Sequence, residues 1–198
     1  MFITTIIINR LKSIFQCKYL AVTIIVLSSS CKKGSEQRHY ESYKAEIEAL
    51  ITYFSKIVPQ DKIIEIEFID DNHLDRLQIT DIDTIWVKND SFYLSSYPQF
   101  SEWDIYISKD IPDSILSELN WNKQTFKTLK SKLDAAGCIS INNESPIILG
   151  HKRNLLGMTS YYVYKKTDPN TLKQIKNAST ELHFFCDSVA WYYDTGAL

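Results

Sequence analysis

Hydrophobic and polar residues from Tyr40 to Val58 recur with the spacing of an amphipathic helix. Apolar side chains fall every three or four positions, and most of the charged ones lie on the opposite side. Pro59 follows directly, and a proline cannot continue a helix. The pattern predicts a helix over residues 40–58 that buries one stripe, formed by Tyr43, Ile47, Leu50, Ile51, Phe54 and Val58.

After Pro59, apolar and polar side chains alternate with a period of two residues. Residues 64–68 alternate strictly between an apolar side chain and Glu65 or Glu67. Such alternation is typical of an antiparallel strand with one face in the core and the other in water. Asn89-Asp90 is suited to the turn of a hairpin. Further strands are predicted over residues 77–80, 84–88, 91–95, 103–108, 138–141, 147–152, 158–165, 181–186 and 189–193.

Three more helices are predicted from the residues at their ends, over residues 112–119, 122–136 and 168–176. Pro112 and the pair Asp168-Pro169 suit the start of a helix, and Gly137 suits a left-handed cap after one. The order of helix, strands, helices and strands predicts an α+β fold. We expect a mainly antiparallel sheet with an N-terminal helix and two or three further helices, forming one globular domain over residues 40–198.

The beginning of the chain has the order of a secretory signal. Residues 1–18 carry three cations and no acid, an apolar run follows over residues 19–27, and three serines precede Cys31. The apolar run with its serines is about a dozen residues long, whereas a helix that crosses a bilayer needs about 20. Residues 1–30 are therefore predicted to be a signal peptide.

The end of this segment, Leu27-Ser28-Ser29-Ser30-Cys31-Lys32-Lys33, resembles the cleavage box of bacterial lipoproteins, in the serine-rich version typical of the Bacteroidota. That family usually has Leu three residues before the Cys, where this chain has Ser28. The resemblance implies cleavage before Cys31, lipidation of Cys31 with acyl chains such as palmitate, and a place in the cell envelope at the outer membrane. Whether the domain faces the periplasm or the cell surface is left open by the sequence.

Composition and charge limit the classes of partner that the sequence favours. The 198 residues are 44% hydrophobic with a formal net charge of −2, which gives no reason to expect nucleic acid. Without residues 1–30 the chain keeps 19 Lys and Arg against 24 Asp and Glu. Electrostatics would not hold such an acidic chain to anionic lipid, whereas two or three acyl chains on Cys31 would. The polar residues 31–39 are predicted to be a tether between lipid and domain.

Two thiols remain after the signal and the lipidated Cys31. Outside the cytoplasm, Cys138 and Cys186 could form a disulfide. Alternatively, both are buried strand residues that act as small apolar side chains.

No motif predicts catalysis, a metal site or a cofactor. The acidic run Asp70–Asp75, with Asp81 and Asp83, is rich in oxygen ligands but lacks the spacing of a calcium loop, so a solvated loop is preferred. The basic run Gly150–Arg153 could bind an anion, but a solvated turn is again preferred.

Aromatic residues on the last strands of the chain are the feature that most favours a binding role. The sequence places three on each of two strands, and some of each set are expected to be exposed for partner binding, with Tyr162, Tyr164, Trp191 and Tyr193 as the candidates. The leading hypothesis is a non-enzymatic, lipid-anchored envelope protein that binds another protein through its sheet. The alternatives are an envelope hydrolase with a site of scattered carboxylates and His, or an immunity-type or inhibitor lipoprotein.

Overall fold

The computed structural model describes residues 34–82, 86–88, 91–93, 98–154, 157–165 and 167–195. The chain divides into two compact units, Met1–Ser42 and Tyr43–Leu198. In the first unit, residues 34–42 are helical, and Gln37 Nε2 donates a hydrogen bond of 2.7 Å to Glu41 Oε1 one turn further on. The predicted tether is thus helical over residues 34–39, because its polar residues make contacts along the helix that the apolar periodicity did not reveal. Cys31 lies outside the described residues.

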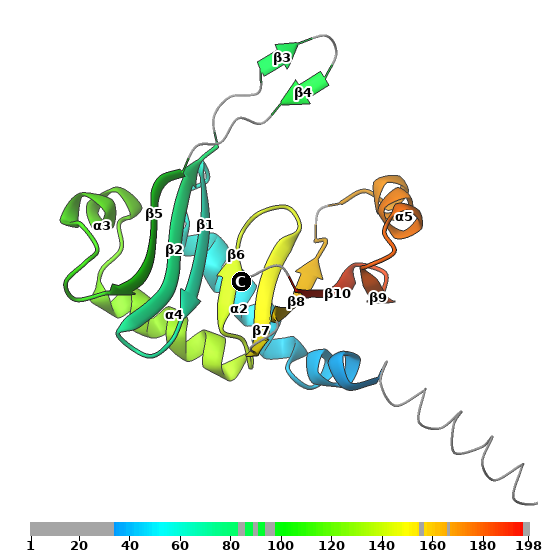
Figure 1. Cartoon of the computed structure of the whole chain (residues 1–198), viewed down its shortest axis with the longest axis horizontal. Helices are drawn as coiled ribbons and strands as arrows, with labels where there is room; N and C mark the ends of the chain where they lie inside the picture. The colour runs from blue at the N-terminus through cyan, green and yellow to red at the C-terminus, as the bar shows by residue number, and fades with distance from the viewer. Residues whose placement is uncertain are drawn as a thin grey trace, which may run out of the picture. The chain divides into compact units, whose positions relative to one another are not determined.

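The second unit contains the α+β fold that the sequence predicted (Figure 1). Its helices are α2 (Lys44–Ile57), α3 (Asp113–Leu119), α4 (Lys123–Ala135) and α5 (Pro169–Ala178). Its strands are β1 (Lys62–Phe68), β2 (His73–Asp81), β3 (Trp86–Lys88), β4 (Ser91–Tyr93), β5 (Pro98–Tyr106), β6 (Ser140–Asn142), β7 (Ile147–Asn154), β8 (Gly157–Val163), β9 (His183–Cys186) and β10 (Val189–Asp194).

One sheet of eight strands organises this unit, in the order β5-β2-β1-β6-β7-β8-β10-β9, and every neighbouring pair is antiparallel. The strands β3 and β4 pair separately as a hairpin. Residues 62–106 supply one half of the large sheet and residues 140–194 the other. The two halves join where β1 pairs with β6, through Glu65 with Asn142, Ile66 with Ile141 and Glu67 with Ser140.

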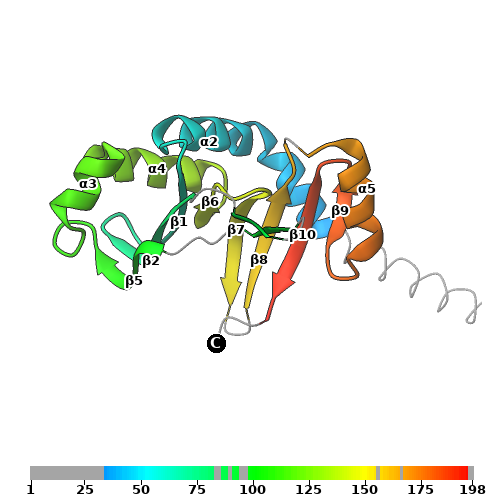
Figure 2. The same ribbon diagram turned by 90° about the horizontal axis from the view of Figure 1, so that it is seen from above.

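Helices α2 and α4 cover one face of the first half, and Figure 2 shows both on the same side of the strands. The apolar stripe predicted for residues 40–58 is the buried side of α2, except for Tyr43, which precedes the helix and is 37% exposed. The apolar side of α4 lies beside it. Trp121 joins the two helices, since its Nε1 donates a 2.8 Å hydrogen bond to Ile57 O and its ring packs against Phe54 and Phe126. The core between helices and sheet includes Ile47, Leu50, Phe54, Ile64, Ile66, Leu77, Ile79, Phe126, Leu129 and Leu133.

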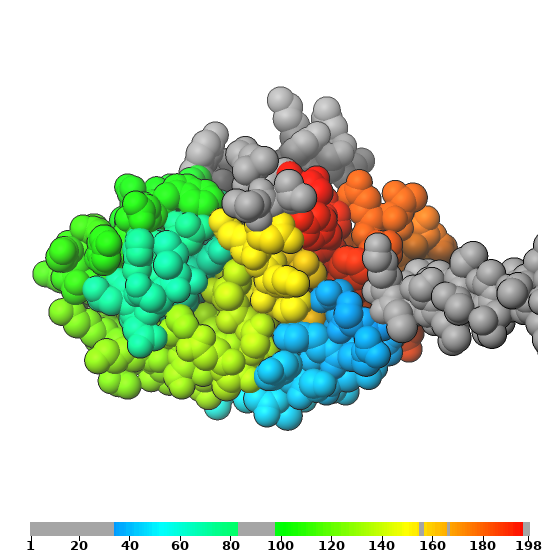
Figure 3. Space-filling view, turned by 60° about the horizontal axis from the view of Figure 1, so that its bottom comes forward, coloured from blue at the N-terminus to red at the C-terminus, as the bar shows by residue number. Residues whose placement is uncertain are grey.

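Helix α5 packs against the far end of the sheet, and Figure 3 shows it (orange) against β10 (red). The cluster beneath it consists of Tyr164, Leu172 and Ala190. Asp168 begins the helix as predicted, because its side chain accepts hydrogen bonds of 3.0 Å from the backbone N–H groups of Asn170 and Thr171. The left-handed residue predicted after α4 is also confirmed, with Gly137 at φ 62°.

Of the two alternatives for the thiols, the disulfide is absent, because Cys138 and Cys186 are both free, and burial of both is correct for Cys138 only. Cys138 is buried between α4 and β6, whereas Cys186 is exposed at the end of β9. Four strand spacings separate β6 from β9, which corresponds to about 19 Å and is too far for a disulfide. Burial raises the pKa of the Cys138 thiol to about 12.

Candidate binding site on the open face of the sheet

The face of β1 and β2 opposite α2 and α4 carries polar side chains. The alternation along β1 sends Ile64 and Ile66 into the core and Glu65 and Glu67 to the other side. The register then places Gln78 of β2 opposite Glu65, and Arg76 opposite Glu67. On the other side of β1, the register adds Asn142 and Ser140 of β6. We call this surface of β5, β2, β1 and β6 the open face, and Figure 1 looks onto it with α2 and α4 behind the strands.

Arg76 lies at the centre of one group on the open face. Its Nη1 is 2.8 Å from Glu65 Oε1, and its Nη2 donates a 2.5 Å hydrogen bond to Gln78 Oε1. Its guanidinium also lies 4.6 Å from the ring centre of Trp103 on β5, the strand that pairs with β2. Trp103 is 55% exposed, so a large aromatic surface is held in place by a cation yet remains open to solvent.

Arg153 of β7 lies at the centre of a second group. Its Nη2 donates a 2.7 Å hydrogen bond to Glu67 Oε2, and its Nη1 is 3.0 Å from Asp75 Oδ2. The Glu67 side chain is only 6% exposed. Burial, together with the nearby charges of Asp75 and Glu65, raises the pKa of Glu67 from 4.5 to about 6 despite the pairing with Arg153.

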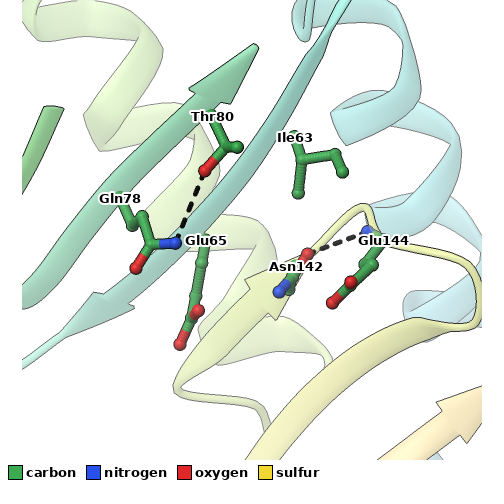
Figure 4. A pocket seen from close by; sticks show the side chains of 6 residues that line it. All are labelled: Ile63, Glu65, Gln78, Thr80, Asn142 and Glu144. Atoms are coloured by element: carbon green, nitrogen blue, oxygen red, sulfur yellow. Dashed lines mark hydrogen bonds between the residues drawn. The ribbon is translucent and has the colours of Figure 1, made fainter. Parts of the chain in front are cut away.

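A small hollow lies next to the Arg76 group, on the side away from Arg153, over β1, β2 and the end of β6 (Figure 4). Its volume is about 100 Å³, and we call it the glutamate pocket. Burial, opposed by Arg76 and reinforced by the charge of Glu144, raises the pKa of Glu65. The residues that line the pocket are Ile63, Glu65, Gln78, Thr80, Asn142 and Glu144.

Hydrogen bonds within the pocket fix its amide groups. Gln78 Nε2 donates to Thr80 Oγ1 at 3.4 Å, and the backbone N–H of Glu144 donates to Asn142 Oδ1 at 2.8 Å. The amide oxygen of Gln78 accepts from Arg76. Each amide oxygen therefore has one donor already, and the carboxylates of Glu65 and Glu144 are the charged acceptors that the pocket offers to a ligand.

The described residues contain no group of three or more His, Cys, Asp or Glu side chains that could hold a metal ion. The arrangement on the open face is instead suited to recognition, because it combines an exposed aromatic ring with paired charges and a polar hollow.

Comparison with protein-family models, with curated proteins and with solved structures gave no match. Within the part of the chain that the structure describes, no helix is long and apolar enough to cross a membrane.

Of the four aromatic residues predicted to bind a partner, Tyr164 is buried, whereas Tyr162, Trp191 and Tyr193 are half-buried. Tyr164 is 6% exposed within the cluster under α5, and Tyr162 packs against the same cluster. Trp191 lies over His183 with ring centres 4.6 Å apart, and the Tyr193 hydroxyl donates a 3.0 Å hydrogen bond to Asn154 Oδ1. The prediction is wrong for Tyr164, because that side chain is buried in the cluster under α5, and it stays a prediction for the three half-buried residues.

The charged runs singled out in the sequence also have structural partners. Asp70 Oδ1 accepts a 2.8 Å hydrogen bond from Asn72 N within a turn, and Asp81 bonds to Lys62. Asp83 lies outside the described residues. In the basic run, Arg153 is paired with two acids and the His151 ring stacks on Tyr161.

Trp103, Arg76 and the glutamate pocket were not predicted as a site. The alternation of Glu65 and Glu67 was the one available signal, because it placed two acids on the side of β1 away from the core. Their partners could not be named without the register between strands.

Proposed function

We propose that this protein is a lipid-anchored protein of the cell envelope, held at the outer membrane through acylated Cys31, whose domain binds another protein through the open face. The observation that carries the binding proposal is Trp103, which is 55% exposed and positioned by Arg76 on the face opposite α2 and α4. Exposed aromatic rings beside arginine are enriched among the residues that dominate protein interfaces.

The hydrolase alternative receives less support from the same face. A general acid needs a raised pKa and access to substrate. Glu65 and Glu67 both have raised pKa values, but the Glu67 side chain is 6% exposed and paired with Arg153. Glu65 is paired with Arg76. Binding is therefore the function that the geometry supports best.

The anchor is tested by intact mass of the protein isolated from its own membrane. We expect a chain that begins at Cys31 and carries acyl chains, and a Cys31→Ala variant that is not lipidated and leaves the membrane fraction. An unmodified mature chain that begins elsewhere would contradict the anchor.

The interface is tested by capture from the same membrane after chemical cross-linking. We expect Trp103→Ala to lose the partner that the unaltered protein captures. Glu102→Ala is the matched control, since Glu102 is exposed on the same strand and points to the opposite face of β5. Equal capture by both variants would remove the open face as the interface.

A further inference from the structure

We propose that the glutamate pocket binds the cationic end of a Lys or Arg side chain that a basic segment of the partner protein inserts into the open face. This inference rests on the proposed function and names the chemistry of the partner.

The size of the pocket fits the end of one side chain. Its volume of about 100 Å³ is a few times the roughly 30 Å³ that a water molecule occupies in the liquid. It is well below the roughly 300–1,000 Å³ typical of pockets that enclose a whole small molecule. Ile63 supplies an apolar wall for the methylene groups next to the charge, which suits the long stems of Lys and Arg.

The charge of the pocket selects a cation. Glu65 and Glu144 both line it. Burial raises the pKa of Glu65, and the negative charge of Glu144 adds to this increase, as expected for two neighbouring carboxylates. Arg76 reaches Glu65 through Oε1, and among the described residues no cation pairs with Glu144. Two acids thus line the pocket and one of them has an arginine partner, so an inserted cation would be attracted to the lining.

The surroundings favour a protein segment over a free small cation. The pocket is shallow, and it lies on the same face as Trp103, with Arg76 between the aromatic ring and Glu65. A segment that inserts a cation between Glu65 and Glu144 would run across β1 and β2 towards Trp103. The predicted mature chain is acidic, with 19 Lys and Arg against 24 Asp and Glu, so a basic partner is also favoured at long range.

The direct test uses the full mature chain and two peptides, acetyl-Gly-Gly-Arg-Gly-Gly-amide and the same peptide with neutral citrulline in place of Arg. We expect the Arg peptide to shift the NMR signals of Glu65, Asn142 and Glu144, and the citrulline peptide to leave them unchanged. Glu144→Gln should lower the affinity for the Arg peptide about tenfold, which is the loss expected for one charge-assisted hydrogen bond. Glu102→Gln is the control for loss of one acid outside the pocket and should leave the affinity unchanged.

Equal shifts with both peptides, or full affinity in Glu144→Gln, would overturn the inference. Partner capture separates this failure from failure of the proposed function. Capture that depends on Trp103 but survives the double change Glu65→Gln and Glu144→Gln would leave the binding function in place and remove the pocket from it. Loss of capture in the double variant, with an unchanged melting temperature, would support both.

Discussion

Arg153 Nη2 donates a 2.7 Å hydrogen bond to Glu67 Oε2, which joins two side chains 86 positions apart in the sequence. Glu67 belongs to β1 in the first half of the sheet, and Arg153 to β7 in the second. The pair lies next to the junction of β1 with β6, so a nearly buried carboxylate is stabilised only when both halves are in place. A change in the protonation of Glu67 should therefore change the stability of the whole unit.

The pH dependence of unfolding should show the raised pKa of Glu67. A carboxyl group with a pKa of 4.5 when unfolded and about 6 when folded adds stability in its protonated form. This contribution is fully present below pH 4.5 and is lost as pH rises through 6. It amounts to about 2 kcal/mol at most, at 1.36 kcal/mol per pKa unit. Urea denaturation from pH 4.5 to 7.5 should show the decrease, and Glu67→Gln should reduce it.

Glu102→Gln provides the comparison for this experiment, because Glu102 is exposed and its replacement removes the same charge as Glu67→Gln. It should keep the pH dependence of the unaltered protein. A Glu67→Gln variant with the same slope as the unaltered protein would show that Glu67 does not titrate near pH 6.

Asn143 should matter more for stability than its neighbour Asn142. The side chain of Asn143 acts as a strand partner for β1, since its Oδ1 accepts from Ile64 N at 2.6 Å and its Nδ2 donates to Lys62 O at 2.9 Å. Asn143→Ala would leave two backbone groups unpaired and should cost about 1–3 kcal/mol. Asn142→Ala should lower the free energy of unfolding by less than about 1 kcal/mol, because the Asn142 side chain accepts only one exposed hydrogen bond, from Glu144 N. Equal losses in urea denaturation would contradict this assignment.

The two free thiols should differ strongly in reactivity. Cys186 is exposed, whereas Cys138 is buried and its pKa is raised to about 12, so its reactive thiolate is scarce at pH 8. Iodoacetamide should label Cys186 in the native protein and Cys138 only after unfolding without reductant. Peptide mapping distinguishes the two sites, and a disulfide-linked pair of peptides would contradict the structure.

Truncation of Trp103 and of Trp121 should reduce the stability of the fold by very different amounts. Trp103→Ala removes an exposed contact with Arg76 and should cost about 0.5–1 kcal/mol. Trp121→Ala empties a site between α2 and α4 and should cost about 3–5 kcal/mol. Urea denaturation of both variants measures the difference. A large loss in Trp103→Ala would mean that its ring stabilises the fold, and reduced capture by that variant would then carry no information on binding.

Local signals allowed much of the fold to be predicted from the sequence. Asp168-Pro169 and Gly137 lie at the helix ends that their backbone preferences favour, and the alternation in residues 64–68 identified the buried face of β1. These features depend on neighbours a few positions away.

The site depended on contacts between distant segments and could not be predicted in the same way. The alternation indicated that Glu67 faces away from the core, but it could not indicate that Glu67 is nearly buried and paired with Arg153 of β7. The aromatic residues of β8 and β10 were assigned to a binding surface because a strand pattern does not reveal what packs on each face. Helix α5 packs on the face of Tyr162 and Tyr164, and Trp191 packs against His183 of β9.

The short junction between β1 and β6 gives the open face a further property. Glu65 belongs to the first half of the sheet, and Asn142 and Glu144 belong to the second, yet all three line the glutamate pocket. The pocket therefore forms only in chains whose halves have docked. A partner bound there would contact both halves of the sheet and would stabilise their association. Amide hydrogen exchange should therefore slow more at the junction of β1 and β6 than at the outer strands.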